Sequence, residues 1–215
     1  MRRTLILGLA LLVAGCNVFG SGPDETYRQG ALLLEEPFDD LSSWERFTAQ
    51  EQNIALGVEG GQYRASAGGS GFIWGLNETT HSDVILEVTA QQQSSAPENA
   101  YGVMCRADPS NNGDGYYFVV GGNGLAAIGR GEGDTVEFLA EGESDHVNTG
   151  RSENTLLAVC VGDYLALYVN GEFVMETRDE RYGSGYAGLA IGSFDAGEPI
   201  EVLFDNLRIW DGSLE

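Results

Sequence analysis

One segment of the chain has the residue types of a calcium-binding loop. Asp108, Ser110 and Asn112 stand at the spacing of the first oxygen ligands of an EF-hand loop, and Gly113 stands where that loop turns sharply. The same loop requires a bidentate carboxylate at its twelfth position, which here is Val119. The stretch "DPSNNGDG" is rich in turn-forming residues. We therefore expect it to join two strands rather than to hold calcium.

A second segment has the glycine spacing of a dinucleotide-binding turn. Gly122, Gly124 and Ala127 match the pattern G-x-G-x-x-A. Such a turn must open a helix whose N-terminus holds the pyrophosphate. The following residues 129–134, "GRGEGD", cannot continue a helix, and Asn123-Gly124 is a typical hairpin turn. We therefore expect no nucleotide site here.

No catalytic constellation is recognisable. Many glycosidases use two carboxylates held a short distance apart, yet no expected strand carries an E-x-D-x-E or E-x-D-x-x-E spacing. The acidic stretch "EGESDH", residues 141–146, reads as a solvated loop, and "GGSGF", residues 68–72, lacks the last glycine of a nucleophile elbow. His81 and His146 do not form the H-x-x-x-H pair of a helical zinc site. We name no catalytic residue and favour binding over catalysis, and an active site assembled only by the fold remains open.

The N-terminal residues predict export and lipid anchoring. "MRR" precedes the uncharged apolar run "TLILGLALLVAG", which is shorter than the roughly 20 residues that span a bilayer and fits the core of a secretory signal. The sequence "LVAGC", Leu12 to Cys16, resembles a bacterial lipobox. That resemblance implies that Cys16 carries a diacylglycerol and becomes the mature N-terminus; an ordinary cleaved signal is the alternative. We expect a signal peptide at 1–15, a flexible tether at 16–30 and a folded domain at 31–215, held at the outer face of the cytoplasmic membrane or at the outer membrane.

The charge of the chain limits its partners. The formal net charge is −22, and all 11 basic residues are arginine. A polyanion repels nucleic-acid backbones and anionic membrane surfaces. We therefore expect no nucleic-acid partner, and contact with a membrane only through the lipid.

The spacing of apolar residues and turns predicts an all-β domain. The segment "TLLAVCVGDYLALYVNGEFVMET" contains two two-residue turns, Gly162-Asp163 and Asn170-Gly171, so Val161 should face Tyr164 and Val169 should face Glu172. This register gives the meander a second apolar face, formed by Leu157, Val159, Tyr164, Ala166, Tyr168, Phe173 and Met175. A second apolar face is either covered or lines a concave groove. With at least a dozen such short strands and 31 glycines, the domain should be a sandwich of two antiparallel sheets.

Cys105 and Cys160 are the two cysteines outside the lipobox. In an exported domain such a pair most often forms a disulfide. Two buried free thiols are the alternative, and a metal pair is disfavoured because no His or third Cys lies close in sequence.

Several segments together resemble the concanavalin A-like jelly rolls of bacteria, a group that includes the laminin G-like domains and the 3-keto-disaccharide hydrolase domain. They are "FDDLSSWERF" (38–47), "YGVMCRADPSNNGDGYYFVVGGNG" (101–124), "LALYVNGEFV" (165–174) and "GYAGLAIGSF…EVLFDNLRIW" (185–210). The resemblance covers nearly the whole expected domain. It implies a two-sheet, antiparallel jelly-roll sandwich, and it says less about function than about fold.

Concave sheets of such sandwiches often hold glycans, with aromatic rings against the sugar. We expect the following glycan-binding candidates: Trp74, Tyr101, Arg106, Tyr117, Tyr164 and Tyr168. Arg106 stands out because a charged residue within a strand is seldom fully buried. Asp205, in "FDNL", is a weak candidate ligand for a structural calcium ion; no other cofactor is expected. We expect a monomeric surface lipoprotein that binds extracellular polysaccharide or an envelope protein; the alternatives are a glycoside-processing enzyme of the 3-keto-disaccharide hydrolase type and a structural envelope lipoprotein without a small ligand.

Overall fold

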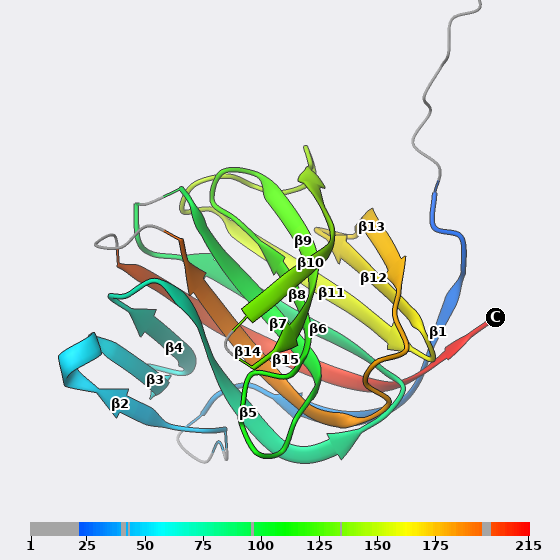
Figure 1. Ribbon diagram of the computed structural model, residues 1–215, viewed down its shortest axis with the longest axis horizontal. Coiled ribbons are helices and arrows are strands. Elements are labelled where there is room, and N and C mark those ends of the chain that lie inside the picture. Colours follow the sequence, from blue (N-terminus) through cyan, green and yellow to red (C-terminus); the bar gives the residue numbers. More distant parts are fainter. Residues whose placement is uncertain (1–21, 40–41, 43, 96, 134, 195–198) are drawn as a thin grey trace, which may run out of the picture.

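The computed structural model describes residues 22–39, 42, 44–95, 97–133, 135–194 and 199–215, so the expected signal peptide and Cys16 lie outside the described residues. Most of the described residues lie in antiparallel strands (Figure 1). The strands are β1 (Tyr27–Glu36), β2 (Phe47–Ala49), β3 (Ile54–Glu59), β4 (Gln62–Ala67), β5 (Gly71–His81), β6 (Val84–Gln92), β7 (Asn99–Ala107), β8 (Gly115–Val120), β9 (Leu125–Glu132), β10 (Thr135–Glu143), β11 (Glu153–Val161), β12 (Tyr164–Val169), β13 (Glu172–Arg178), β14 (Gly185–Ser193) and β15 (Ile200–Leu214). A single 3-10 turn, η1 (Gln50–Gln52), joins β2 to β3. Among the described residues, no helix has the length and the hydropathy that a membrane span requires.

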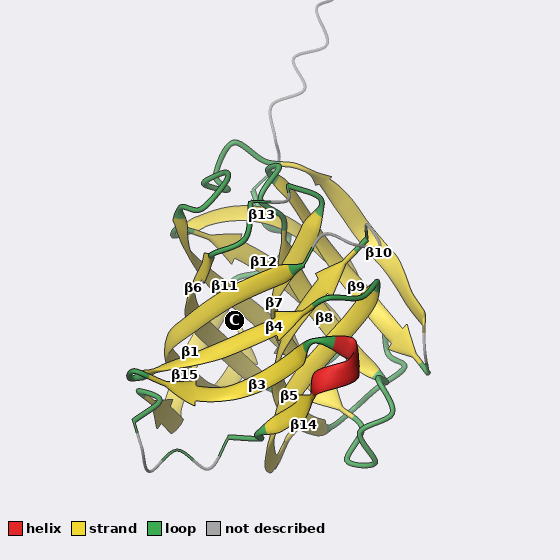
Figure 2. Cartoon of the chain, turned by 90° about the vertical axis from the view of Figure 1, so that its left-hand side faces the viewer, coloured by secondary structure: helices red, strands yellow, loops and turns green. Residues whose placement is uncertain are grey.

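The strands form two packed sheets, which Figure 2 shows as two layers. The large sheet has nine strands in the order β13-β12-β11-β6-β15-β4-β3-β2, with β1 also paired to β15. The small sheet has six strands in the order β10-β9-β8-β7-β14-β5. Strand β15 is long enough to pair with β4 through its first half and with β1 through its second half. The predicted jelly-roll sandwich is confirmed.

The predicted meander has the expected register at both turns. Val161 faces Tyr164 and Val169 faces Glu172. Asn170 and Gly171 both have positive φ, 55° and 85°, as a type I′ turn requires. A bulge between Leu167 and Tyr168 then changes the register of β13, so that Met175 packs against the core between the sheets. The expectation that Met175 shares the second face was therefore wrong, because a bulge reverses the side-chain alternation beyond it.

The core lies between the sheets, and one covalent link crosses it. Cys105 on β7 of the small sheet and Cys160 on β11 of the large sheet form a disulfide. Both residues are almost fully buried, among the aromatic and branched side chains of the main core. The predicted disulfide is confirmed, and it fastens one layer of the sandwich to the other.

The N-terminal segment covers part of the second face of the meander. The backbone N–H of Asp24 donates to both carboxylate oxygens of Glu176, at 3.1 and 2.9 Å. Tyr27 packs edge-on against Tyr168, with ring centroids 5.3 Å apart. Strand β1 begins at Tyr27, before the expected domain start near Ala31. This part of the meander is therefore covered by the chain itself.

Candidate functional site

The structure separates the expected glycan-binding residues into three places. Tyr101 and Arg106 lie inside the sandwich, Tyr164 and Tyr168 lie on the outer face of the large sheet, and Trp74 and Tyr117 lie on the outer face of the small sheet. They therefore do not form one groove.

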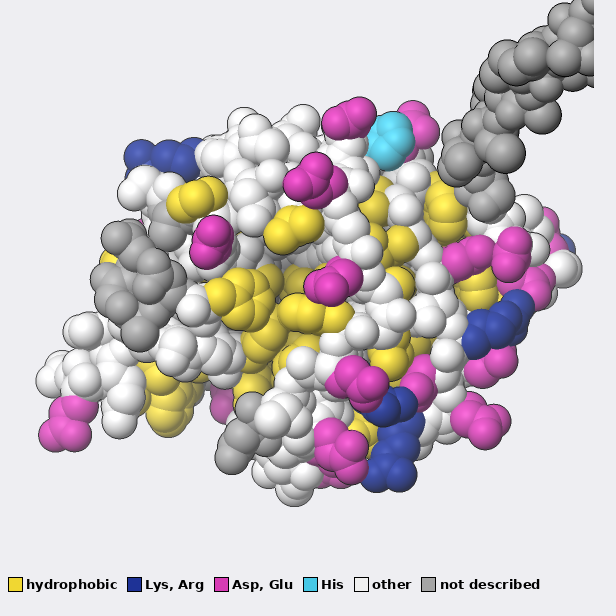
Figure 3. All heavy atoms as spheres, turned by 45° about the horizontal axis from the view of Figure 1, so that its top comes forward, with side chains coloured by type: hydrophobic (Ala, Val, Ile, Leu, Met, Phe, Trp, Pro, Cys, Tyr) yellow, Lys and Arg dark blue, Asp and Glu magenta, His cyan; other side chains and the backbone are white. Residues whose placement is uncertain are grey.

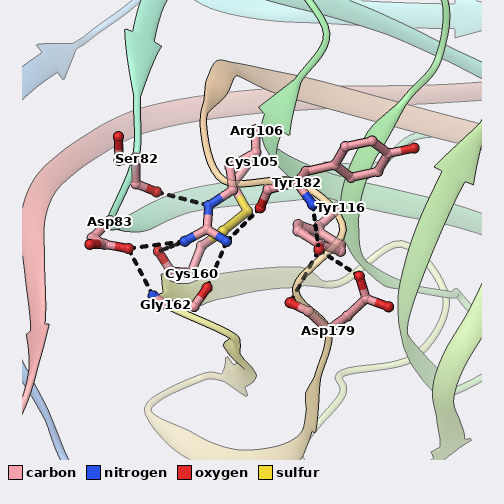
Figure 4. Close-up of a disulfide and its surroundings, with 9 residues drawn as sticks. All are labelled: Ser82, Asp83, Cys105, Arg106, Tyr116, Cys160, Gly162, Asp179 and Tyr182. Atoms are coloured by element: carbon pink, nitrogen blue, oxygen red, sulfur yellow. Dashed lines mark hydrogen bonds and ion pairs between the residues drawn. A yellow bond between two sulfur atoms is a disulfide. The ribbon is translucent and has the colours of Figure 1, made fainter.

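Arg106 lies beside the disulfide, as Figure 4 shows, and it is buried. Its Nε donates to the carbonyl of Ser82 at 2.9 Å, and its Nη1 donates to the carbonyls of Gly162 and Tyr182 at 2.8 Å. Its Nη2 pairs with the Asp83 carboxylate at 3.0 Å. The Arg106 side chain is only 2% exposed. This buried position does not fit the expectation that Arg106 contacts a glycan.

A bulge explains why the strand pattern misplaces Arg106. Between the pairs Tyr186–Ala107 and Gly188–Met104, strand β7 has two residues opposite a single residue of β14. Arg106 itself has a φ of 52°, which is uncommon for a residue with a side chain. The bulge re-aims the side chain, which regular alternation would send outward. Arg106 therefore helps to hold the two sheets together. We call its contacts with Ser82, Asp83, Gly162 and Tyr182 the joint between the sheets.

A second polar brace lies beside this joint (Figure 4). The Tyr116 hydroxyl donates to the Asp179 carboxylate at 2.6 Å and accepts from the backbone N–H of Tyr182. Burial, and then the bond to Asp179, raise the pKa of Tyr116 to about 12. Burial acts to raise the pKa of Asp179, but its hydrogen bonds with Tyr116, Arg181 and Arg130 lower that pKa below the usual value. Neither group changes charge near neutral pH, so we assign the brace to structure.

The candidate tyrosines on β7 and β12 expose little surface to a ligand. Tyr101 is fully buried, and its hydroxyl accepts from Asn154 at 2.9 Å. Tyr164 is buried, and its hydroxyl donates to Glu176 at 2.6 Å. Tyr168 is half-buried between the rings of Tyr27 and Phe173.

Trp74 and Tyr117 lie under the loop that has calcium-like spacing. The Trp74 indole N–H donates to the Asn111 side-chain oxygen, and the Tyr117 hydroxyl donates to the Gly113 carbonyl at 2.9 Å. The carboxylates of Asp108 and Asp114 accept backbone N–H groups, so they shape the loop. Among the described residues, no group of three or more His, Cys, Asp or Glu side chains is arranged to hold a metal ion.

A cleft of about 230 Å³ opens beside Tyr117 on the same outer face of the small sheet. Figure 3 shows hydrophobic side chains gathered in a hollow on this side of the molecule, with acidic side chains around them. We call it the small-sheet cleft and define it by its lining residues: Glu98, Asn99, Ala100, Val119, Val120, Gly121, Asn123, Leu125, Ala126, Ala127, Phe138, Glu141 and Phe194.

Two phenylalanines form the exposed walls of the cleft. Phe138 on β10 is 36% exposed and Phe194, directly after β14, is 51% exposed. Their ring centroids lie 6.5 Å apart, and Phe194 also contacts Phe72, at 5.7 Å. Phe138 and Phe194 meet edge-on, at an interplanar angle of 78°. The exposed surface of such an aromatic cluster is suited to pack against an apolar ligand surface.

Small residues on the central strands keep the floor of the cleft low. The floor includes Ala100 and Ala127. Beside it, a Cβ on Gly192 would lie 2.8 Å from the Phe72 ring, and a Cβ on Gly129 would lie 2.7 Å from Val136. Glycine at these positions allows the neighbouring side chains to lie close to the sheet.

Phe138 and Phe194 were not among the residues expected to bind a ligand. Phe138 belongs to the acidic strand "TVEFLAE", and Phe194 precedes the polar sequence "DAGEP". An apolar ring in each of these polar surroundings is the signal that could have marked them.

The central strands of this face offer no carboxylate pair. Strands β7, β8, β9 and β14, which the structure describes throughout, contain one acidic residue, Glu132. Glu132 forms an ion pair with Arg181 at 3.2 Å. The paired carboxylates on one strand that many glycosidases need are therefore missing from these strands.

Asp205 lies in β15 of the large sheet, where the strand exchanges partners. Its carboxylate accepts the backbone N–H of Asn206 at 2.7 Å, and the register with β6 shifts just beyond it. Asn206 has a φ of 53°. The "FDNL" sequence therefore forms a bulge at this point.

No protein-family model matches this chain, and no curated protein matches it significantly. Among solved structures it is similar to the carbohydrate-binding module CBM66 from Bacillus subtilis, with a TM-score of 0.62 and 19% identity over 80% of this chain and 97% of that one. It is also similar to a Bacillus subtilis protein of unknown function with a galectin-like fold, with a TM-score of 0.64 and 12% identity over 87% of this chain and 99% of that one.

A third similar structure is a prokaryotic beta-1,3-1,4-glucanase (lichenase) derived from a mouse hindgut metagenome. Its TM-score is 0.61, and it is 11% identical over 83% of this chain and 98% of that one. At such identities the likeness establishes the fold, which is the jelly roll that the sequence predicts.

Proposed function

We propose that this protein is an exported lipoprotein whose jelly-roll domain binds a glycan in the small-sheet cleft. The observation that carries the proposal is the pair of exposed rings, Phe138 and Phe194, above a floor of small residues. Sugar rings have an apolar C–H face that packs against aromatic side chains, while their hydroxyls seek polar groups at the rim. Asn123 lines the cleft, and its side-chain amide is a polar group of this kind. One of the similar structures is a carbohydrate-binding module, which supports this proposal.

Removing the cleft's exposed rings should weaken glycan binding. If each ring covers about 60 Å² of sugar, its loss costs about 1.5 kcal/mol, or about a tenfold increase in Kd. We expect Phe138→Ala and Phe194→Ala each to weaken binding about tenfold. The measurement is a glycan array with the purified protein, followed by calorimetric titration of the glycans that bind.

A matched control is Leu33→Ala, which removes an apolar side chain that is 47% exposed on β1 of the large sheet. It should leave binding unchanged. Full binding by the Phe138→Ala/Phe194→Ala double variant would place the ligand elsewhere, and an array with no bound glycan would favour a structural role in the envelope. Hydrolysis of a glycoside panel, tested with and without a chelator, would favour the enzymatic alternative.

The lipid anchor is the second part of the proposal, and it rests on the sequence "LVAGC". We expect the protein to incorporate labelled palmitate when it is expressed in a bacterial host. Cys16→Ser should abolish the label and release the protein from the membrane fraction. The matched variant Cys105→Ser, a residue of the disulfide, should keep the label. A labelled Cys16→Ser protein, or an unlabelled wild type, would contradict lipidation.

A further inference from the structure

We infer that the small-sheet cleft selects uncharged glycan chains and rejects acidic ones such as polyuronates; this inference rests on the proposed function. The charged residues that line the cleft are Glu98 and Glu141, and no arginine is among the lining residues. The whole chain carries a net charge of −22. A carboxylate on the ligand would therefore meet like charges at the cleft and a repulsive field during its approach.

The two glutamates come from separate elements. Glu98 lies just before β7, and Glu141 lies on β10, beyond the wall residue Phe138. Glu98 and Glu141 take part in none of the ion pairs found among the described residues. Their charge is therefore not neutralised by a neighbouring arginine.

The arginine that β9 contributes to the small sheet is engaged elsewhere. Arg130 on β9 pairs with Glu137 at 2.6 Å and with Asp179. Its side chain is therefore held by two carboxylates and does not line the cleft. A uronate that entered the cleft would find no cation to pair with.

The same carboxylates favour an uncharged ligand. An ionised carboxylate accepts hydrogen bonds and donates none, and sugar hydroxyls are donors. Hydrogen bonds to a charged acceptor are stronger than neutral ones. Glu98 and Glu141 thus accept hydroxyls at the rim while Phe138 and Phe194 hold the apolar ring face. Selectivity arises because the same two carboxylates attract the hydroxyls of a neutral glycan and repel the carboxylates of an acidic one.

The test uses pairs of polysaccharides that share a backbone and differ at C6, where one member carries a hydroxymethyl group and the other a carboxylate. Purified protein is titrated with soluble β-glucan, α-glucan and galactomannan, and with each polymer after oxidation of C6 to the uronate. We expect the neutral member of any pair that binds to do so at least tenfold more tightly at low salt. Raising the salt concentration should narrow the difference, because salt screens charges at an open cleft.

The double variant Glu98→Gln/Glu141→Gln should reduce this preference to about threefold or less, mainly by improving binding of the oxidised polymer. Its control, Glu59→Gln/Glu172→Gln, makes the same change of charge on β3 and β13 of the large sheet. The control should keep the preference. Equal or tighter binding of the oxidised polymers by the wild type would overturn the inference and leave glycan binding intact, as would an unchanged preference in Glu98→Gln/Glu141→Gln. Failure of every polymer to bind, neutral and oxidised, would instead overturn the proposed function.

Discussion

Replacing Arg106 by Met should lower the free energy of unfolding by about 3 kcal/mol or more. The guanidinium satisfies the carbonyls of Ser82, Gly162 and Tyr182 inside a site that leaves its own side chain 2% exposed. Met fills a similar volume but donates no hydrogen bond. A buried acceptor that loses its partner costs about 1–3 kcal/mol, and several acceptors lose theirs together. Urea unfolding followed by circular dichroism measures the loss.

Two further variants separate the role of Arg106 from a general effect of charge. Arg208→Met removes an arginine that is 41% exposed and pairs with Glu35 at 3.1 Å, so it should cost less than about 1 kcal/mol. Arg106→Lys keeps the charge but lacks the planar fork of donors, and it should recover only part of the stability. An Arg106→Met protein that is as stable as the wild type but binds glycan poorly would instead show that Arg106 contributes to ligand binding.

Arg106 shows where reading a strand from its sequence fails. Regular alternation and the general exposure of arginine together place its side chain in solvent. Both arguments assume that the strand has no bulge and that the core offers no partners. The bulge in β7 and the carbonyls around the joint contradict both assumptions. Neither feature is local in sequence, so neither could be read from the chain alone.

The fold itself could be predicted because much of its information is local. Asn170-Gly171 sets a turn, the turn sets the register of β12 and β13 at Val169 and Glu172, and the register decides which side chains share a face. The order of the strands within each sheet could not be predicted in this way. The pairing of β1 with β15 joins the two ends of the domain, and no turn between them specifies it. Bringing two such distant strands together costs chain entropy, and packing between the strands must offset that cost.

The site was less predictable than the fold for the same reason. Tyr164 and Tyr168 do form an apolar second face, but residues of the N-terminal segment cover part of it. Phe138 lies on β10 and Phe194 directly follows β14; these strands are not neighbours in the small sheet and are far apart in sequence, yet the two ring centroids lie 6.5 Å apart. An apolar face is visible in a sequence; what covers it is not.

Removing the disulfide should have the largest single effect on stability, about 4 kcal/mol. The link closes a loop with a sequence separation of 55 between Cys105 and Cys160. In the chain-entropy account, a loop of that length loses about 4 kcal/mol of unfolded-state entropy when it is closed. The double variant Cys105→Ala/Cys160→Ala should therefore unfold at a much lower urea concentration. Its m-value should rise, because an unlinked unfolded chain exposes more surface.

The wild type, reduced in denaturant and then refolded under reducing conditions, should show the same loss, whereas reduction should leave the double variant unchanged. A loss below about 1 kcal/mol in both experiments would mean that packing alone holds the layers together. The Cys160 carbonyl lies 3.5 Å from Arg106 Nη2, so the disulfide and the guanidinium share one site. Groups in contact give non-additive effects in a double-mutant cycle. We therefore expect Arg106→Met to cost less in the Cys105→Ala/Cys160→Ala background than in the wild type, because the joint that it supports is then already loosened.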